Sequence, residues 1–242
     1  MRFVIQTFLP TSYQLAKQLM VGLILLCSVQ AGMAQTLPEN YDFGLGITYE
    51  ISSGKNGNLQ KGEQLAMWFS KGDYTGMESP KRKGFFMVMD LKTQKMVTLL
   101  TDQKMAMVMD LGKMQQRMQG QGKEDKQAAV KVSKTGKSAT IAGYHCIQYL
   151  VESDDSRSLV WITNELGNGM GNFAKSLAAM LETGPKPIRL PSMSGMENGV
   201  MLRMETTDKK SGNSSNFEAV AVSKEGRKLA TTGFKVMAMP GQ

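Results

Sequence analysis

The chain has 242 residues, with 29 basic and 21 acidic side chains and a formal net charge of +8. No stretch combines clustered lysine and arginine with interleaved aromatic residues, so we do not expect nucleic acid as a partner. Only two cysteines occur, which excludes a disulfide-rich scaffold and leaves stability to core packing.

Residues 1–34 have the pattern of a cleavable export signal. Arg2 and Lys17 are the only charged residues of this segment, and an apolar run, LMVGLILL, follows at 19–26. The run is shorter than the ~20 apolar residues that span a bilayer. Small residues precede an expected cleavage near Ala34. We therefore expect a periplasmic or secreted protein.

Removal of the signal leaves residues 35–242, which we expect to form a single β-rich domain. The net charge falls from +8 to +6, because Arg2 and Lys17 leave and no acidic residue does. A lipoprotein anchor on Cys27 is not favoured, because Leu26 stands where a lipoprotein signal needs a small residue. The expected product has no stable membrane anchor, and its oligomeric state is left open.

The mature chain consists mainly of short β-type segments separated by turn residues. Each segment is rich in β-branched, aromatic or methionine residues and is bounded by glycine, asparagine, aspartate or lysine. The expected strands cover residues 46–52, 64–70, 84–90, 95–100, 104–110, 138–142, 144–152, 158–163, 200–207, 216–223 and 228–237. Their regular spacing is typical of an antiparallel sheet or an open barrel.

Three segments interrupt this pattern. Residues 112–128 are polar and rich in glutamine and lysine, which indicates a flexible loop. Residues 171–183 predict one covering helix, since Phe173 and Leu177 begin an apolar face at helical spacing. Residues 184–199 are rich in proline, glycine, serine and methionine, so we expect an irregular connection there.

One short sequence occurs twice. Met-Val-Met-Asp-Leu stands at 87–91 and again at 107–111, a separation of about one hairpin. No third copy follows, so we interpret the repeat as similar strand chemistry and not as a solenoid.

Methionine is the unusual feature of the composition. The chain has 21 methionines, and 18 remain after Met1, Met20 and Met33 are removed with the signal. Many are two residues apart, so that they share one face of a strand. The three stripes are Phe85, Met87 and Met89; Met105, Met107 and Met109; and Met237 and Met239.

Three interpretations of the stripes stay open. The methionines can fill the core in place of leucine and isoleucine. They can line an adaptable cavity for an apolar ligand, because methionine is flexible and polarisable. They can also bind Cu(I), because thioethers are soft ligands. The candidate lining residues are Phe85, Met87, Met89, Met105, Met107 and Met109.

Catalytic chemistry has few candidate residues. His145 is the only histidine of the mature chain, and no G-x-S-x-G nucleophile motif accompanies it. Cys146 is adjacent, so the two side chains should point to opposite faces of one strand. We expect a structural, hydrogen-bonded histidine and a half-buried thiol. Asp154 and Asp155 can hold Ca²⁺ in principle, but a solvated hairpin tip is favoured. We expect no catalytic residue, no cofactor and no His, Cys, Asp or Glu metal site.

One block resembles a known family. In residues 138–167, Ile141-Ala142-Gly143-Tyr144, Cys146 and Tyr149 form one strand motif, and Trp161 and Thr163 form a second after a turn. This block is similar to the signature of exported bacterial proteins of the domain of unknown function 4412 family. Residues 85–110 and 199–208 are similar to further family segments.

The resemblance implies a lipoprotein-carrier-like fold. It predicts a mainly β architecture, with a curved antiparallel sheet that forms an open half-barrel and a helix that covers its mouth. Relatives with that fold hold acyl chains or lipoproteins in the concave face, and no catalytic residues carry over. We therefore expect non-catalytic binding of an apolar ligand, a lipid or a lipidated partner. The alternatives are a Cu(I)-binding envelope protein and a structural or stress-related envelope protein without a small ligand.

Overall fold

The computed structural model describes residues 37–55, 58–113, 130–168, 171, 174 and 199–238. These residues belong to one compact unit that begins at Leu37. The export signal expected at 1–34 lies outside the described residues. The same holds for nearly all of the expected loop, helix and irregular connection at 112–128, 171–183 and 184–199.

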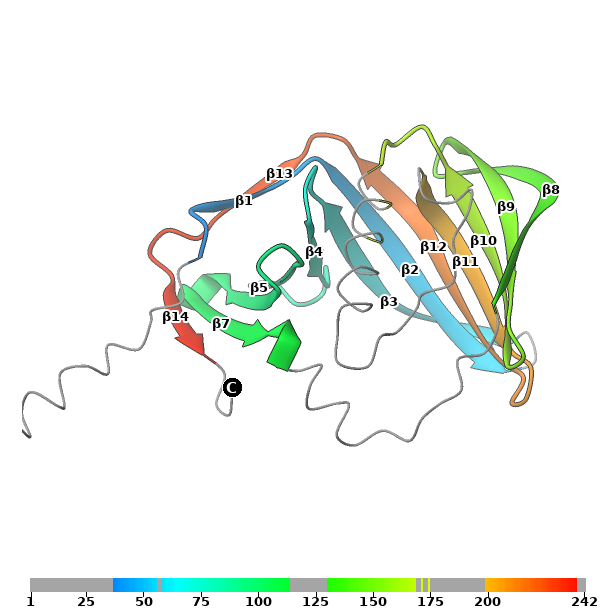
Figure 1. The fold of residues 1–242 in the computed structure, drawn as a ribbon, viewed down its shortest axis with the longest axis horizontal. Coiled ribbons are helices and arrows are strands. Elements are labelled where there is room, and N and C mark those ends of the chain that lie inside the picture. The colour runs from blue at the N-terminus through cyan, green and yellow to red at the C-terminus, as the bar shows by residue number, and fades with distance from the viewer. Residues whose placement is uncertain are drawn as a thin grey trace, which may run out of the picture. The chain divides into compact units, whose positions relative to one another are not determined.

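Within the described residues, fourteen strands and a short 3-10 helix, η1, form the fold (Figure 1). The bounds of the first seven strands are β1 Asn40–Phe43, β2 Leu45–Lys55, β3 Asn58–Phe69, β4 Tyr74–Glu78, β5 Phe85–Asp90, β6 Lys95–Leu100 and β7 Met105–Asp110, with η1 at Thr101–Gln103. The bounds of the others are β8 Lys131–Ile141, β9 Tyr144–Glu152, β10 Ser156–Thr163, β11 Val200–Asp208, β12 Asn213–Ser223, β13 Arg227–Ala230 and β14 Lys235–Ala238.

Twelve of these strands form one long, open sheet in the order β14-β7-β6-β5-β4-β3-β2-β12-β11-β10-β9-β8. The expectation of a wholly antiparallel sheet is wrong in one place, because β14 pairs parallel to β7. A hairpin forces its two strands to be antiparallel. No hairpin joins β7 to β14, which is distant in sequence, so β14 is free to add in the other direction.

β1 and β13 form a separate two-stranded antiparallel sheet. Tyr41 and Phe43 of β1 belong to a buried cluster with Phe86, Val88, Val97, Leu99, Ala106 and Val108 from β5, β6 and β7. The small sheet therefore covers one face of these three strands. Burial of this face explains why its residues are valine, leucine, alanine and phenylalanine.

A second core lies on the central and C-terminal strands. Its buried members are Leu45, Ile47, Tyr49, Phe69, Ile141, Cys146, Trp161, Val200, Leu202 and Ala219. A smaller cluster of Tyr149, Val160 and Ile162 packs with Met201 and Met204. No helix in the described part of the chain is long and apolar enough to cross a membrane.

The two copies of Met-Val-Met-Asp-Leu occupy equivalent places. Each copy consists of the last four residues of a strand, β5 or β7, and the leucine that follows that strand. β6 lies between β5 and β7 and pairs with both. Each aspartate ends its strand in the same way: Asp90 Oδ1 accepts a hydrogen bond from the amide of Thr93 at 3.0 Å, and Asp110 Oδ1 accepts one from Lys113 at 2.9 Å. The repeat therefore encodes a strand and its terminating turn.

The expected strands at 95–100 and 144–152 are confirmed with the same bounds. The expected strand at 228–237 is wrong, because it is divided between β13 and β14 in two different sheets. Gly233 separates them with a φ of 82°, in a turn where the amide of Phe234 donates to the carbonyl of Thr231 at 3.1 Å. A left-handed glycine at this point turns the chain from one sheet to the other.

Candidate functional site

The strand register gathers methionines from six strands on one face of the main sheet. Residues that are paired across neighbouring strands point to the same side. By this rule Phe85, Met87 and Met89 of β5 share a face with Met105, Met107 and Met109 of β7. All six candidate lining residues therefore lie on one face, although β6 separates the two groups.

One row of this face crosses six strands. Met67 of β3 pairs with Met77 of β4, and Met77 pairs with Met87 of β5. Met87 pairs with Thr98 of β6, which pairs in turn with Met107. Met107 also pairs with Met237 of the edge strand β14. Five methionines thus stand in one line with a single threonine between them.

The next row contains three methionines on consecutive strands. Met89 of β5 pairs with Met96 of β6, and Met96 pairs with Met109 of β7. On the other side of Met89 the row continues to Thr75 of β4, whose hydroxyl donates to the carbonyl of Trp68 at 2.8 Å. This row therefore places three thioethers side by side.

We call this side of the sheet the methionine face. It carries Met77, Met87, Met89, Met96, Met105, Met107, Met109 and Met237, together with Phe85 and Leu100. All ten side chains are half-buried. On the opposite face, Phe86 and Val88 of β5 are 1% and 0% exposed. The alternation along each strand thus sends valine into the core and methionine to a partly accessible surface.

The eight methionines of this face differ from the methionines that fill the cores. Met201 and Met204 of β11 pack against one buried cluster, and Met67, at the β3 end of the first row, packs against another, so we do not count Met67 in the methionine face. None of the eight is among the buried or partly buried members of the three clusters formed by the described residues. Within the described part of the chain, the methionines of β5 and β7 thus form a group apart from the core methionines.

Charge is sparse on the methionine face. Lys235 of β14, paired with Met105, is exposed at its edge. The nearby row of Asp90, Lys95 and Asp110 alternates with the methionine row and so points to the other face. Among the described strands, the face therefore offers thioether sulfur and apolar surface, with the cation of Lys235 at its margin.

The spacing of methionines in the sequence did not predict Met77 and Met96 as members of this face. It predicted Met237 on a separate stripe with Met239, and Met239 lies outside the described residues. A hairpin signal was available for Met96, because the turn between 85–90 and 95–100 aligns Met96 with Met89. No local signal joins β14 to β7, since that pairing is between distant segments.

Cys146 lies in the core, whereas His145 lies at the surface. Cys146 is fully buried, not half-buried as expected, and its Sγ donates to the carbonyl of Tyr144 at 3.5 Å. Burial raises the pKa of this thiol, which disfavours the nucleophilic thiolate. His145 is exposed, and its backbone amide, not its ring, donates to Glu165 Oε1 at 3.2 Å. The expectation of a histidine held by hydrogen bonds of its ring gains no support.

The acidic turn between β9 and β10 interacts with lysines. Asp155 forms an ion pair with Lys210, and the ammonium of Lys209 donates to the carbonyl of Ser153 at 2.8 Å. The hydrogen bond from Lys210 to Asp155 and their opposite charges raise the pKa of Lys210. This turn therefore joins two hairpin tips. No group of His, Cys, Asp or Glu in the described part of the chain is arranged to hold a metal ion.

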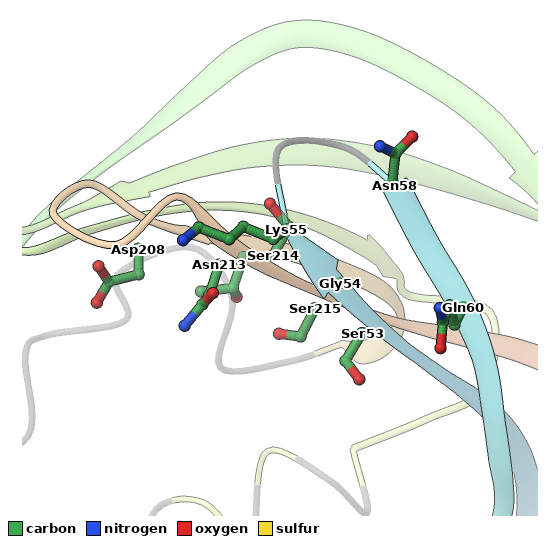
Figure 2. A pocket seen from close by; sticks show the side chains of 10 residues that line it. Ser53, Gly54, Lys55, Asn58, Gln60, Asp208, Asn213, Ser214 and Ser215 are labelled. Atoms are coloured by element: carbon green, nitrogen blue, oxygen red, sulfur yellow. The ribbon is translucent and has the colours of Figure 1, made fainter.

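A polar hollow of about 840 Å³ lies near these tips (Figure 2). Lys55 and Asn58 line it from the β2–β3 side, and Asp208 and Asn213 line it from the β11–β12 side. Asp208 Oδ1 accepts hydrogen bonds from the backbone amides of Ser211 and Lys210 and from the Ser211 hydroxyl, which lower the pKa of Asp208. Its carboxylate is thus engaged by its own turn, and the hollow lacks the apolar lining of a lipid site.

The fold and the site define a mainly β protein whose most unusual surface is a sheet face of thioethers. Over residues 58–231 the sequence matches the family described as domain of unknown function (DUF4412), and the chain belongs to this family. This confirms the resemblance found at residues 138–167. No curated protein matches the sequence.

Several solved structures are similar at low sequence identity. PNGF-II has a TM-score of 0.38 and 14% identity, with 83% of this chain and 32% of that chain covered. MucB in complex with MucA(peri) has a TM-score of 0.36 and 9% identity, with 75% and 50% covered. The LolA superfamily protein from Nitrosomonas europaea has a TM-score of 0.29 and 10% identity, with 83% and 92% covered. The chain thus spans a third of PNGF-II and half of MucB, and likenesses of this size carry no inference about function.

Proposed function

We propose that this protein binds an apolar ligand, a lipid or the acyl chain of a lipidated partner on the methionine face, without catalysis. The observation that carries the proposal is the row from Met77 through Met87 and Met107 to Met237, which is half-buried and separate from the cores. Flexible thioether side chains adapt to an irregular apolar ligand at low cost.

Several further features support this proposal. The export signal that the sequence predicts at 1–34 would bring the chain to the envelope, where lipids and lipidated proteins occur. The half-barrel curvature expected from the family resemblance would give the face a concave shape. The chemistry of the face suits acyl chains, since burial of methylene groups contributes about 0.8 kcal/mol each and needs no polar partner. The exposed Lys235 at its margin suits the acidic head group of such a ligand.

Binding of a fluorescent fatty acid tests the proposal, together with mass spectrometry of lipids that copurify with the protein. We expect saturable uptake by the purified protein. Met107→Glu places a charge at the centre of the face, and burial of that charge beside an acyl chain should weaken uptake at least about ten-fold. Val220→Glu is the matched control, since Val220 is 47% exposed on β12 and should leave uptake unchanged.

Absence of both copurified lipid and fatty-acid uptake would exclude the proposal and favour a structural or stress-related envelope protein without a small ligand. Uptake that is unaffected by Met107→Glu would place the ligand elsewhere. Circular dichroism of both variants verifies that the sheet is intact.

A further inference from the structure

Met89, Met96 and Met109 stand next to one another on three consecutive strands. Paired residues on neighbouring antiparallel strands have Cβ atoms about 4.5–5.5 Å apart. Met96 is paired with Met89 on one side and with Met109 on the other. Each sulfur is two bonds beyond its Cβ on a flexible stem. The outer two side chains can therefore lean toward the central one and bring three sulfurs around one point.

The surroundings of these three residues keep the sulfurs available. All three side chains are half-buried and lie outside the core clusters of the described residues. The next residue of the row, Thr75, is 1% exposed and its hydroxyl already donates to the carbonyl of Trp68. The charged residues Asp90 and Lys95 point to the opposite face. The other polar side chains of the two methionine rows are the hydroxyls of Thr75 and Thr98, which are neutral oxygen donors and poor competitors of thioethers for a soft metal ion.

This set of donors selects a particular metal. Thioethers are neutral, soft ligands that favour Cu(I), whereas Zn²⁺ sites use thiolate, imidazole or carboxylate and Ca²⁺ and Mg²⁺ need oxygen. We propose that Met89, Met96 and Met109 form a three-sulfur binding site for Cu(I). The proposal goes beyond apolar ligand binding, because it depends on the sulfur atoms and not on the apolar character of the face.

An anaerobic titration tests this site. The purified protein competes for Cu(I) with bicinchoninic acid, a coloured Cu(I) chelator, and the loss of colour reports the metal taken by the protein. We expect uptake of one Cu(I) with sulfur-only coordination in X-ray absorption. Because thioethers carry no proton, the uptake should be the same at pH 5 and pH 7, unlike that of a histidine or cysteine site.

Leucine substitutions separate sulfur from apolar surface. Leucine and methionine have similar volumes, and their exchange usually costs less than about 1.5 kcal/mol. Met96→Leu should weaken Cu(I) binding at least about ten-fold, and the triple variant Met89→Leu, Met96→Leu, Met109→Leu should abolish it. The matched control changes Met67, Met201 and Met204 to leucine, since these three do not lie in one row of adjacent strands.

The outcomes distinguish this proposal from the preceding one. Cu(I) uptake that the triple variant loses and the control retains supports a thioether site. Failure of the unchanged protein to withdraw Cu(I) from the chelator overturns the proposal and leaves apolar binding untouched. Equal Cu(I) affinity in the triple variant also overturns it. Thermal melting of each variant shows whether the fold is retained.

Discussion

Tyr49 illustrates how one residue connects two distant strands. Its side chain is 0% exposed, and its hydroxyl donates to the carbonyl of Met201 at 2.6 Å, joining β2 to β11. Its ring lies 6.4 Å from that of Phe217 on β12. Burial raises the pKa of this phenol, because the phenolate would lose its hydration in the core.

Because of this raised pKa, the free energy of unfolding should depend on pH in the alkaline range. In the unfolded chain tyrosine titrates near its ordinary pKa of about 10. Above that pH the unfolded state binds fewer protons than the native state, so the free energy of unfolding falls as pH rises. Each such group contributes a slope of about 1.4 kcal/mol per pH unit. Burial, followed by the charges of Asp90 and Tyr74, likewise raises the pKa of Tyr41.

Tyr49→Phe should therefore have two opposite effects. At pH 8 the variant should lose about 1 kcal/mol of stability, because the hydrogen bond to Met201 is removed. Between pH 10 and 11 its stability should decline less steeply than that of the unchanged protein, since Tyr41 is then left as the described phenol with a raised pKa. Urea unfolding curves from pH 8 to 11 measure both effects. Equal slopes for the two proteins would contradict the assignment.

At the scale of elements, Arg227 fixes the small sheet to the large one. Arg227 begins β13 and forms an ion pair with Glu78 of β4. Its guanidinium carbon lies 5.1 Å from the ring centroid of Trp68 and 4.7 Å from that of Phe86. The indole of Trp68 donates to the same Glu78 oxygen at 2.9 Å. Three strands of the main sheet thus contact one arginine of the covering sheet.

Arg227→Ala should destabilise the protein by about 2 kcal/mol, because it removes a charge-assisted hydrogen bond and two cation–π contacts from a partly buried place. Lys61→Ala is the control. Lys61 pairs with Glu50 at 3.0 Å, but its side chain is 79% exposed, so its loss should cost less than about 0.5 kcal/mol. Chemical denaturation gives both values. A cost for Arg227→Ala no larger than that of the control would show that β13 is held without this arginine.

At the scale of elements, the sequence predicts the pairing of strands that follow one another in hairpins, but it does not predict the pairing of strands that are far apart in the chain. The strands 84–90, 95–100 and 104–110 follow one another with short turns, so both their existence and their pairing are local properties. β1 and β4 have only four and five residues, too few for a clear alternation, and neither was expected. The pairing of β1 with β13 depends on burial of Tyr41 and Phe43 against the large sheet, which no local pattern reveals.

The candidate site shows the same limit. The period-two spacing placed each methionine stripe on one strand face, and this needs only the sequence. To predict that the stripes share one face, the strand order must also be known. Met96 joins the face because β6 pairs with β5, and Met237 joins it because β14 pairs parallel to β7. The sequence therefore predicted the components of the methionine face without its extent.

At the scale of the whole sheet, the two edges need protection, because an unpaired strand edge is a template for association with another chain. β8 forms one edge and carries exposed lysines at 131, 134 and 137. β14 forms the other edge and begins with the exposed Lys235. Its neighbour β7 has the sequence MAMVMD, in which the only charge is the terminal Asp110. β14 thus covers a strand that would otherwise be an apolar edge.

Deletion of residues 235–242 should convert the protein into an aggregating species. The truncation removes the hydrogen bond from the amide of Lys235 to the carbonyl of Lys104, at 2.8 Å, and exposes the free edge of β7. It also removes Val236, which packs against the core beneath β1, at a cost of about 1.5 kcal/mol. We expect dimers or larger species in size-exclusion chromatography with light scattering, with a fraction that rises with protein concentration.

Deletion of residues 239–242 alone is the matched control, because it leaves β14 in place and should preserve the oligomeric state of the full chain. A second variant separates edge exposure from loss of stability. Introducing Met107→Lys into the longer truncation places a charge in the middle of the exposed strand, and this should reduce association without restoring Val236. If the longer truncation associates no more than the full chain, β14 does not protect the edge. If Met107→Lys leaves association unchanged, the truncated protein associates through unfolding and not through β7.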